Sequence, residues 1–222
     1  MRAQIAGFLS AAEPPPGNAG APKAIIAPHA GTIYSGPIAA TAYRRLGAAE
    51  GVERIVILGP AHRVPLVGIA APSADAFATP LGEVTIDRAT VDELLTNGLV
   101  VEDDGAHRVE RSLEIHLPCI QLTFPDAEIV PLVVGATATE DVKAVIDTCW
   151  RGPETRFVVS TDLSHFHSYE VGQALDRETS SLIEELRFEA LNGDRACGAF
   201  PLRGMLLAAR ERQLSVATVD LR

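Results

Sequence analysis

The sequence predicts a single α/β domain, residues 1–222, with a mainly parallel central sheet flanked by helices. Three short apolar runs, at residues 24–27, 54–58 and 156–159, are rich in β-branched side chains. Uninterrupted runs of this kind are typical of strands that are buried on both faces of a parallel sheet. Hydrophobic residues make up 47% of the chain but aromatic residues only 5%, so we expect an aliphatic core.

Turn, proline and capping residues delimit the other elements. Residues 10–22, rich in Pro, Gly and Ala, predict an irregular loop. Asp87 can cap a helix, Pro118 must bend or interrupt one, and Pro131 favours an edge strand or a bulge over a central strand. Helices are expected over residues 36–46, 88–97, 112–122, 139–149, 170–187 and 198–212. Further strands are expected over residues 65–71, 77–84, 128–134 and 214–220.

Charge and composition argue against several classes of protein. The net charge of −10 disfavours non-specific binding to nucleic acid and adsorption to anionic membranes. No apolar run approaches the roughly 18–20 residues of a membrane span, and residues 1–9 lack the apolar core of a signal peptide. Three cysteines make an odd count, which suits a reducing compartment better than a disulfide framework. We therefore expect a cytoplasmic protein, and the sequence leaves its oligomeric state open.

A histidine closely follows each of the three apolar runs, and these are His29, His62 and His165. Because the carboxyl ends of neighbouring parallel strands meet at one edge of a sheet, we expect the three imidazoles to converge there. Neutral imidazoles suit zinc, iron or copper, so this edge is a candidate metal site. The alternative is that all three are ordinary residues of polar loops.

A metal site of this kind needs a third ligand. The candidates are Asp162, Glu114, His165 and Cys197. Cys197 precedes a predicted helix, and the positive N-terminal end of a helix favours the thiolate form that binds metals. A lone cysteine is more often a small core residue, which is the role that we expect for Cys119 and Cys149.

Asp162 and His165 lie three positions apart and could act as an acid/base pair, as an orienting pair or as metal ligands. The alternative is that Asp162 only caps a turn. Glu114 and His116 would point apart on a regular helix, so a shared pocket needs a distorted turn near Pro118. The chain has no Gly-rich phosphate loop and no Gly-x-Ser-x-Gly motif, which disfavours nucleotide-driven and α/β-hydrolase chemistry.

Taken together, the short motifs of this chain resemble those of the Memo family, the B component of the bacterial and archaeal AmmeMemoRadiSam group. Each block is weak alone, but all of them occur in the family's order from residue 24 onward. The blocks are residues 28–31 (Pro-His-Ala-Gly), 34–37 (Tyr-Ser-Gly-Pro), 59–63 (Gly-Pro-Ala-His-Arg), 79–82 (Thr-Pro-Leu-Gly), 112–118 (Ser-Leu-Glu-Ile-His-Leu-Pro), 129–132 (Ile-Val-Pro-Leu), 160–165 (Ser-Thr-Asp-Leu-Ser-His) and 197–198 (Cys-Gly).

The resemblance implies a fold similar to that of the class III extradiol dioxygenases, which are non-haem iron(II) enzymes that open catechol rings. It implies metal ligation by His29, His62 and Cys197. It also implies catalytic side chains in the same pocket, namely His165, Asp162 and His116. Fe(II) is the favoured metal, with Cu or Zn as alternatives.

The chain departs from the family and from the dioxygenases at particular positions. Cys197 stands where the related dioxygenases have a glutamate ligand, so the resemblance does not carry ring cleavage over to this chain. Thr32 and Arg111 stand where the family usually has Tyr and His. The sequence ends at Arg222, where the family pattern continues, so the resemblance leads us to expect a C-terminal end that is shortened relative to the family.

Two functions of different classes follow. The first is a metal-dependent oxidoreductase that acts on O₂ or on a small aromatic or reducing substrate. The second is a non-catalytic protein that binds a peptide or handles metal in an enzyme-like cleft, as eukaryotic relatives linked to phosphotyrosine peptides suggest. The expected partner is therefore a small-molecule substrate or a peptide. Zinc-dependent hydrolysis is a third, less favoured function.

Overall fold

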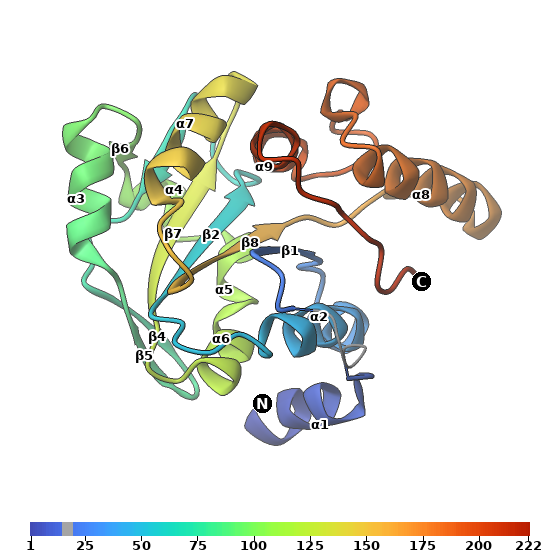
Figure 1. Ribbon diagram of the computed structural model, residues 1–222, viewed down its shortest axis with the longest axis horizontal. Helices are drawn as coiled ribbons and strands as arrows, with labels where there is room; N and C mark the ends of the chain where they lie inside the picture. Colours follow the sequence, from blue (N-terminus) through green and yellow to red (C-terminus); the bar gives the residue numbers. More distant parts are fainter. Residues whose placement is uncertain (15–19) are drawn as a thin grey trace.

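The computed structural model describes residues 1–14 and 20–222, and its centre is a six-stranded sheet with helices on both faces (Figure 1). Four neighbouring strands run parallel, the fifth is antiparallel to the fourth, and the sixth is parallel to the fifth. In spatial order the strands are β1 (Ala24–Ala27), β8 (Thr155–Ser160), β2 (Arg54–Pro60), β7 (Glu128–Val134), β3 (Ile69–Ala71) and β6 (Val101–Glu102). The predicted α/β class with a mostly parallel sheet is confirmed.

The helices divide between the two faces of the sheet (Figure 1). The helices α1, α2 and α6 pack together on one face, whereas α7 and α9 pack together on the other. The helices are α1 (Arg2–Ala11), α2 (Thr32–Leu46), α3 (Arg88–Thr96), α4 (Asp104–His107), α5 (Arg111–Glu114), α6 (Leu117–Thr123), α7 (Thr139–Cys149), α8 (Tyr169–Glu184), the 3-10 helix η1 (Phe188–Ala190) and α9 (Ala199–Glu211). In place of one strand over residues 77–84, the structure has a separate antiparallel hairpin of β4 (Ala76–Thr79) and β5 (Gly82–Thr85).

The core is formed by the central strands, as the apolar runs predict. Every residue of β8 is buried, and in β2 and β7 every residue after the first is buried. Helices on both faces remove both sets of alternating side chains from water, so these strands have no polar face. The apolar area buried in this way is the main source of stability for such a sheet.

Two local predictions about helix starts are confirmed. The carboxylate of Asp87 accepts the backbone N–H of Thr90 at 2.9 Å and thereby caps α3. The predicted helix around Pro118 is split into α5 and α6, and Pro118 lies in the first turn of α6. Its missing N–H costs nothing at that position, because the first N–H groups of a helix have no partner within the helix.

The prediction that Pro131 lies in an edge strand or a bulge is wrong. Its strand, β7, lies between β2 and β3. The backbone N and C=O of Ile129 and Pro131 point away from β2. The carbonyl of Ile129 accepts the N–H of Asp87 on that side, and residues two apart in a strand point their backbone polar groups to the same side. On that side β3 pairs with β7 only at Val133 and Val134, so no ladder bond is lost at the proline.

The prediction for the two ends of the chain is partly wrong. Residues 10 and 11 belong to α1, a helix that the sequence pattern did not predict. Residues 12–14 and 20–22 are irregular as expected, and residues 15–19 of the expected loop lie outside the described residues. Residues 214–220 form no strand. Their polar groups bond to helices instead, because Asp220 accepts the hydroxyl of Thr41 in α2 and the N–H of Thr218 donates to Glu184 in α8.

Within residues 1–14 and 20–222, none of the helices combines the length and apolar character that a membrane crossing requires.

The topology places three loops side by side. The strands β1, β8 and β2 are adjacent and parallel, so their carboxyl ends share one edge of the sheet. His29, His62 and His165 all lie in the loops that leave this edge. The loops that carry the three histidines therefore leave the same edge of the sheet.

The contact between α7 and α9 gives a test of the fold. A Cβ atom on Gly204 in α9 would overlap the side chain of Val142 in α7 and lie 3.2 Å from the backbone nitrogen of Lys143. We expect Gly204→Ala to lower the free energy of unfolding by about 1–3 kcal/mol, the usual cost of overpacking. Urea denaturation followed by circular dichroism measures this change.

Gly7→Ala is the matched control, because Gly7 also lies in a helix but a Cβ atom added there would meet no other atom within 4 Å. The free energy of unfolding of that variant should rise by about 0.5–1 kcal/mol, because alanine has the higher helix propensity. An equal gain for Gly204→Ala would show that α7 and α9 do not pack this closely.

Candidate metal centre

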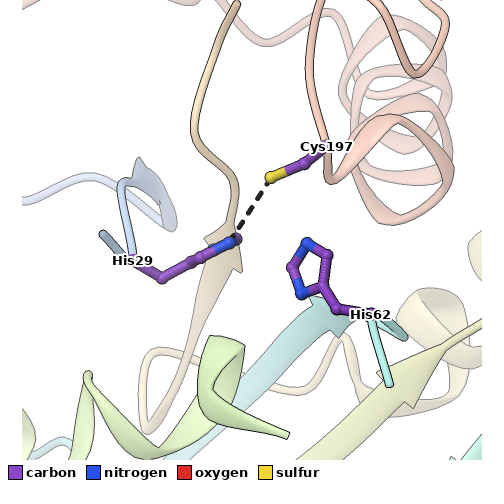
Figure 2. Close-up of side chains that lie close together, drawn as sticks. All are labelled: His29, His62 and Cys197. Carbon is purple, nitrogen blue, oxygen red and sulfur yellow. Dashed lines mark hydrogen bonds between the residues drawn. The ribbon is translucent and has the colours of Figure 1, made fainter. Parts of the chain in front are cut away.

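Three potential ligand atoms converge at the carboxyl edge of the sheet (Figure 2). The ring nitrogens of His29 and His62 and the sulfur of Cys197 lie within 4.8 Å of one another. The Nε2 atom of His29 is 3.4 Å from the Cys197 sulfur, and the two imidazole ring centroids are 5.1 Å apart. Residues far apart in the sequence therefore form one compact cluster.

Cys197 reaches this cluster because its backbone is bonded to the loop after β8. Its N–H donates to the carbonyl of Asp162 at 3.2 Å, and the N–H of Gly198 donates to the Thr161 hydroxyl at 2.8 Å. A Cβ atom on residue 198 would lie 2.5 Å from the carbonyl oxygen of Ser160. Glycine at this position therefore lets the start of α9, and Cys197 with it, approach the end of β8.

Asp162 joins the loop after β8 to the loop after β1. Its Oδ1 atom accepts the backbone N–H groups of His29 at 2.8 Å and Ala30 at 3.2 Å. Its Oδ2 atom lies 3.8 Å from the Nε2 atoms of both His29 and His165. One carboxylate oxygen thus fixes the His29 loop, while the other faces the cluster.

His165 lies at the outer side of the cluster, and its side chain is 42% exposed. With Asp162 and Cys197 it forms a second group whose potential ligand atoms lie within 4.8 Å of one another. The structure therefore brings Asp162 and His165 to the same place as the three predicted metal ligands. A partly exposed imidazole beside a carboxylate can exchange protons with solvent.

His62 is held by Glu110, a residue that no sequence motif singled out. The backbone N–H of His62 donates to Glu110 Oε2 at 2.6 Å, and its Nδ1 atom is 3.0 Å from Oε1. Burial opposes ionisation of Glu110, but hydrogen bonds from His62 and Ser112 outweigh it and lower the pKa of Glu110 to about 2. Glu110 is the N-cap residue of α5, and no sequence signal identified it, because Ser, Thr, Asp and Asn are the typical residues at that position.

His116 lies beneath the cluster and not at its open side. Its side chain is buried, with 1% exposure, and its Nε2 atom is 3.0 Å from the hydroxyl of Ser160. Burial, followed by the nearby His29, lowers the pKa of His116 to about 3, so this imidazole stays neutral. The neighbouring candidate Glu114 is exposed, as the spacing along a helix predicts.

The cluster stabilises a thiolate beside an imidazolium in the protein without metal. Burial opposes ionisation of Cys197, but hydrogen bonds with His29 and His62 outweigh it and lower the thiol pKa to about 6. Interactions with Cys197 and then Glu110 raise the pKa of His62 to about 10, against the effect of burial. Cys119 and Cys149 differ from Cys197, because burial raises the pKa of each thiol to about 12.

The donor set fits a thiophilic transition metal. Two imidazoles and one thiolate are the ligand types that zinc, iron and copper accept. Metal–nitrogen bonds of ~2.1 Å and metal–sulfur bonds of ~2.3 Å at a tetrahedral angle place nitrogen and sulfur about 3.6 Å apart. The 3.4 Å separation of His29 Nε2 and Cys197 Sγ is close to that value.

The fold and the cluster together define an α/β protein with a candidate metal centre at the carboxyl edge of its sheet. Residues 1–218 match the family described as Memo-like protein. The chain is 31% identical over 201 residues to a MEMO1 family protein of Methanothermobacter thermautotrophicus, and the aligned residues are 85% of this chain and 72% of the relative. It is 35% identical over 174 residues to a MEMO1 family protein of Aquifex aeolicus, covering 77% and 64% respectively. The chain therefore belongs to the Memo family.

The thiolate at Cys197 can be tested by alkylation of the metal-free protein. The rate of reaction with iodoacetamide should rise with pH around a midpoint near 6, since only the thiolate attacks and its pKa is lowered to that value. Mass spectrometry of the modified peptides identifies which cysteine reacts. Cys119 and Cys149 should stay unmodified in the folded protein, because both are buried.

His62→Ala should move the midpoint upward, because it removes one of the groups that lower the thiol pKa. A midpoint near 9, the ordinary value, in the unmutated protein would contradict the arrangement.

Proposed function

We propose that this Memo-family protein binds one redox-active transition metal through His29, His62 and Cys197 and acts as an oxidoreductase. The single observation that carries the proposal is the convergence of two imidazole nitrogens and one sulfur within 4.8 Å. Fe(II) is the favoured metal and Cu is the redox-active alternative. Zn accepts the same nitrogen and sulfur ligands but has no redox chemistry, so a zinc-bound form would not act as an oxidoreductase. The proposed substrate is O₂ together with a small aromatic or reducing molecule.

The chain's own residues would bind the metal, orient its ligands and move protons. Glu110 orients the His62 ring through Nδ1 and leaves Nε2 to face the cluster. Asp162 holds the His29 loop and faces His165 with its free oxygen. His165 is the residue best placed to exchange a proton between Asp162 and solvent. A bound iron or copper ion would supply the electron transfer that none of these side chains can perform.

The thiolate distinguishes this site from one built with a carboxylate. Sulfur donates more charge to the metal and selects softer ions than a carboxylate oxygen does. The similarity to extradiol dioxygenases stays a prediction, and so does any ring-cleaving activity. The proposal therefore covers the class of reaction, a metal-dependent oxidation, and names no particular product.

One observation favours the alternative function, a cleft that binds a peptide. Phe166 follows His165 directly, is fully exposed, and adopts a left-handed backbone conformation with φ of 61°. Its ring centroid lies 5.9 Å from that of His165. An exposed aromatic ring held in a strained conformation beside the cluster could contact a bound partner.

The metal content of anaerobically purified protein tests the proposal. Mass spectrometry should find near-stoichiometric iron or copper in the unmutated protein. Cys197→Ala and His62→Ala should each lose the metal, because two remaining ligands bind a transition metal weakly. His167→Ala is the control, since His167 is exposed and lies outside both groups of potential ligands.

An unmutated protein that stays free of metal after anaerobic incubation with Fe(II) or Cu(I) would contradict the proposal. A peptide that binds such a protein, and loses affinity when Phe166 is changed to Ala, would support the binding function instead.

A further inference from the structure

A buried cluster of polar groups lies directly beneath the candidate metal centre. Its members are the hydroxyl of Ser160, the backbone carbonyl of Ser112 and the imidazoles of His29 and His116. Ser160 and Ser112 are fully buried. Polar groups at such depth need complete hydrogen bonding, because water cannot replace a missing partner.

The direction of each hydrogen bond in this cluster is determined by a single acceptor. The hydroxyl oxygen of Ser160 lies 2.6 Å from the carbonyl oxygen of Ser112. A carbonyl can only accept, so the one proton of the hydroxyl points at Ser112. Any other direction would leave two oxygen atoms with facing lone pairs in a buried environment, which is costly.

Both imidazoles must therefore donate to Ser160. The oxygen has two lone pairs left, and two ring nitrogens lie within hydrogen-bond distance of it, His29 Nδ1 at 2.7 Å and His116 Nε2 at 3.0 Å. Each of these nitrogens must carry a proton to form its bond. Since the pKa of His116 is lowered to about 3, that ring is neutral and its Nδ1 atom carries the lone pair.

We propose that Ser160 is a positioning residue that holds His29 in the Nδ1–H tautomer and so leaves the Nε2 lone pair free for the metal. His116 assists, because its N–H occupies the second lone pair of Ser160 and keeps the hydroxyl pointing at Ser112. The inference rests on the proposed metal site, and it gives His116 a supporting role in place of direct contact with a substrate.

The tautomer of His29 is important because Cys197 can compete with the metal for the Nε2 atom. Its sulfur lies 3.4 Å from His29 Nε2, and a neutral imidazole could instead place its proton on Nε2 and donate to the thiolate. That tautomer would block the ligand atom with a proton. Ser160 opposes it, because the Nε2–H form would leave the Ser160 lone pair and the bare Nδ1 atom facing each other at 2.7 Å.

The other histidine ligand, His62, also has a hydrogen-bond partner at its Nδ1 atom, but that partner is charged. The Nδ1 atom of His62 faces the carboxylate of Glu110, whereas that of His29 faces a neutral hydroxyl. A carboxylate partner raises the basicity of an imidazole ligand more than a hydroxyl does. The two histidines are therefore unequal ligands, and Glu110→Gln provides a reference variant for the strength of such support.

Nitrogen-15 NMR of histidine-labelled, metal-free protein at pH 8 tests the proposal, because the chemical shift of each ring nitrogen reports whether that nitrogen carries a proton. In the unmutated protein, the His29 signals should show a protonated Nδ1, the atom that faces Ser160. In Ser160→Ala they should change to the Nε2–H form, which donates to Cys197. The control is Thr179→Ala, an equally buried loss of a hydroxyl, because the Thr179 hydroxyl donates to the carbonyl of Leu175 within α8 and to no imidazole.

Titration with Zn(II) gives the second measurement. We expect Ser160→Ala to weaken binding by about 10- to 100-fold, as loss of a ligand's supporting hydrogen bond does, and Thr179→Ala to keep the original affinity. An Nε2–H tautomer in the unmutated protein, or an unchanged tautomer in Ser160→Ala, would overturn the proposal. The unmutated spectrum decides even where Ser160→Ala does not fold. Absence of Zn(II) binding to a protein with the expected tautomer would count against the metal site and not against Ser160.

Discussion

The parallel pairing of β1 with β8 and of β8 with β2 is the constraint on which the candidate metal centre depends. The loops that follow adjacent parallel strands leave the sheet at the same edge. Residues at the start of these loops therefore lie close together although they are far apart in the sequence. The rigid core beneath then limits how far these loops can move. Asp162 completes the arrangement, because its carboxylate accepts two N–H groups of the loop that carries His29.

Each potential ligand is supported by a buried or partly buried polar group. His62 has the carboxylate of Glu110, His29 has the hydroxyl of Ser160, and Cys197 accepts the backbone N–H of Asp162 at 3.3 Å. Such support fixes the direction of the ligand atoms before a metal arrives, which lowers the ordering cost of binding. It also balances charge, because the thiolate and Glu110 both lie close to His62, whose pKa they raise.

Much of this arrangement could be predicted from the sequence, because its signals are local. β-branched runs identified the buried strands, and the histidines that follow them identified the edge of the sheet. Cys197 was indicated by its position before a helix and by resemblance to the Memo family. Pro131 gave a misleading signal, since a proline's effect depends on whether a neighbouring strand needs its N–H, and β3 is too short to reach it. The C-terminal segment did so too, because side chains of α2 and α8 occupy its polar groups.

The sequence by itself determined the fold class, the family and the residue types that could bind a metal, because hydrophobic periodicity and ordered motifs are properties of the chain alone. Only the tertiary structure decided which polar groups support those residues. Glu110 carries no local signal, and Ser160 lies in a family motif that assigns it no role. The sequence around His116 does not show whether that residue faces a substrate or a buried hydroxyl. Hydrogen-bond partners distant in sequence are chosen by packing, and the direction of each bond follows from which atoms the fold leaves without water.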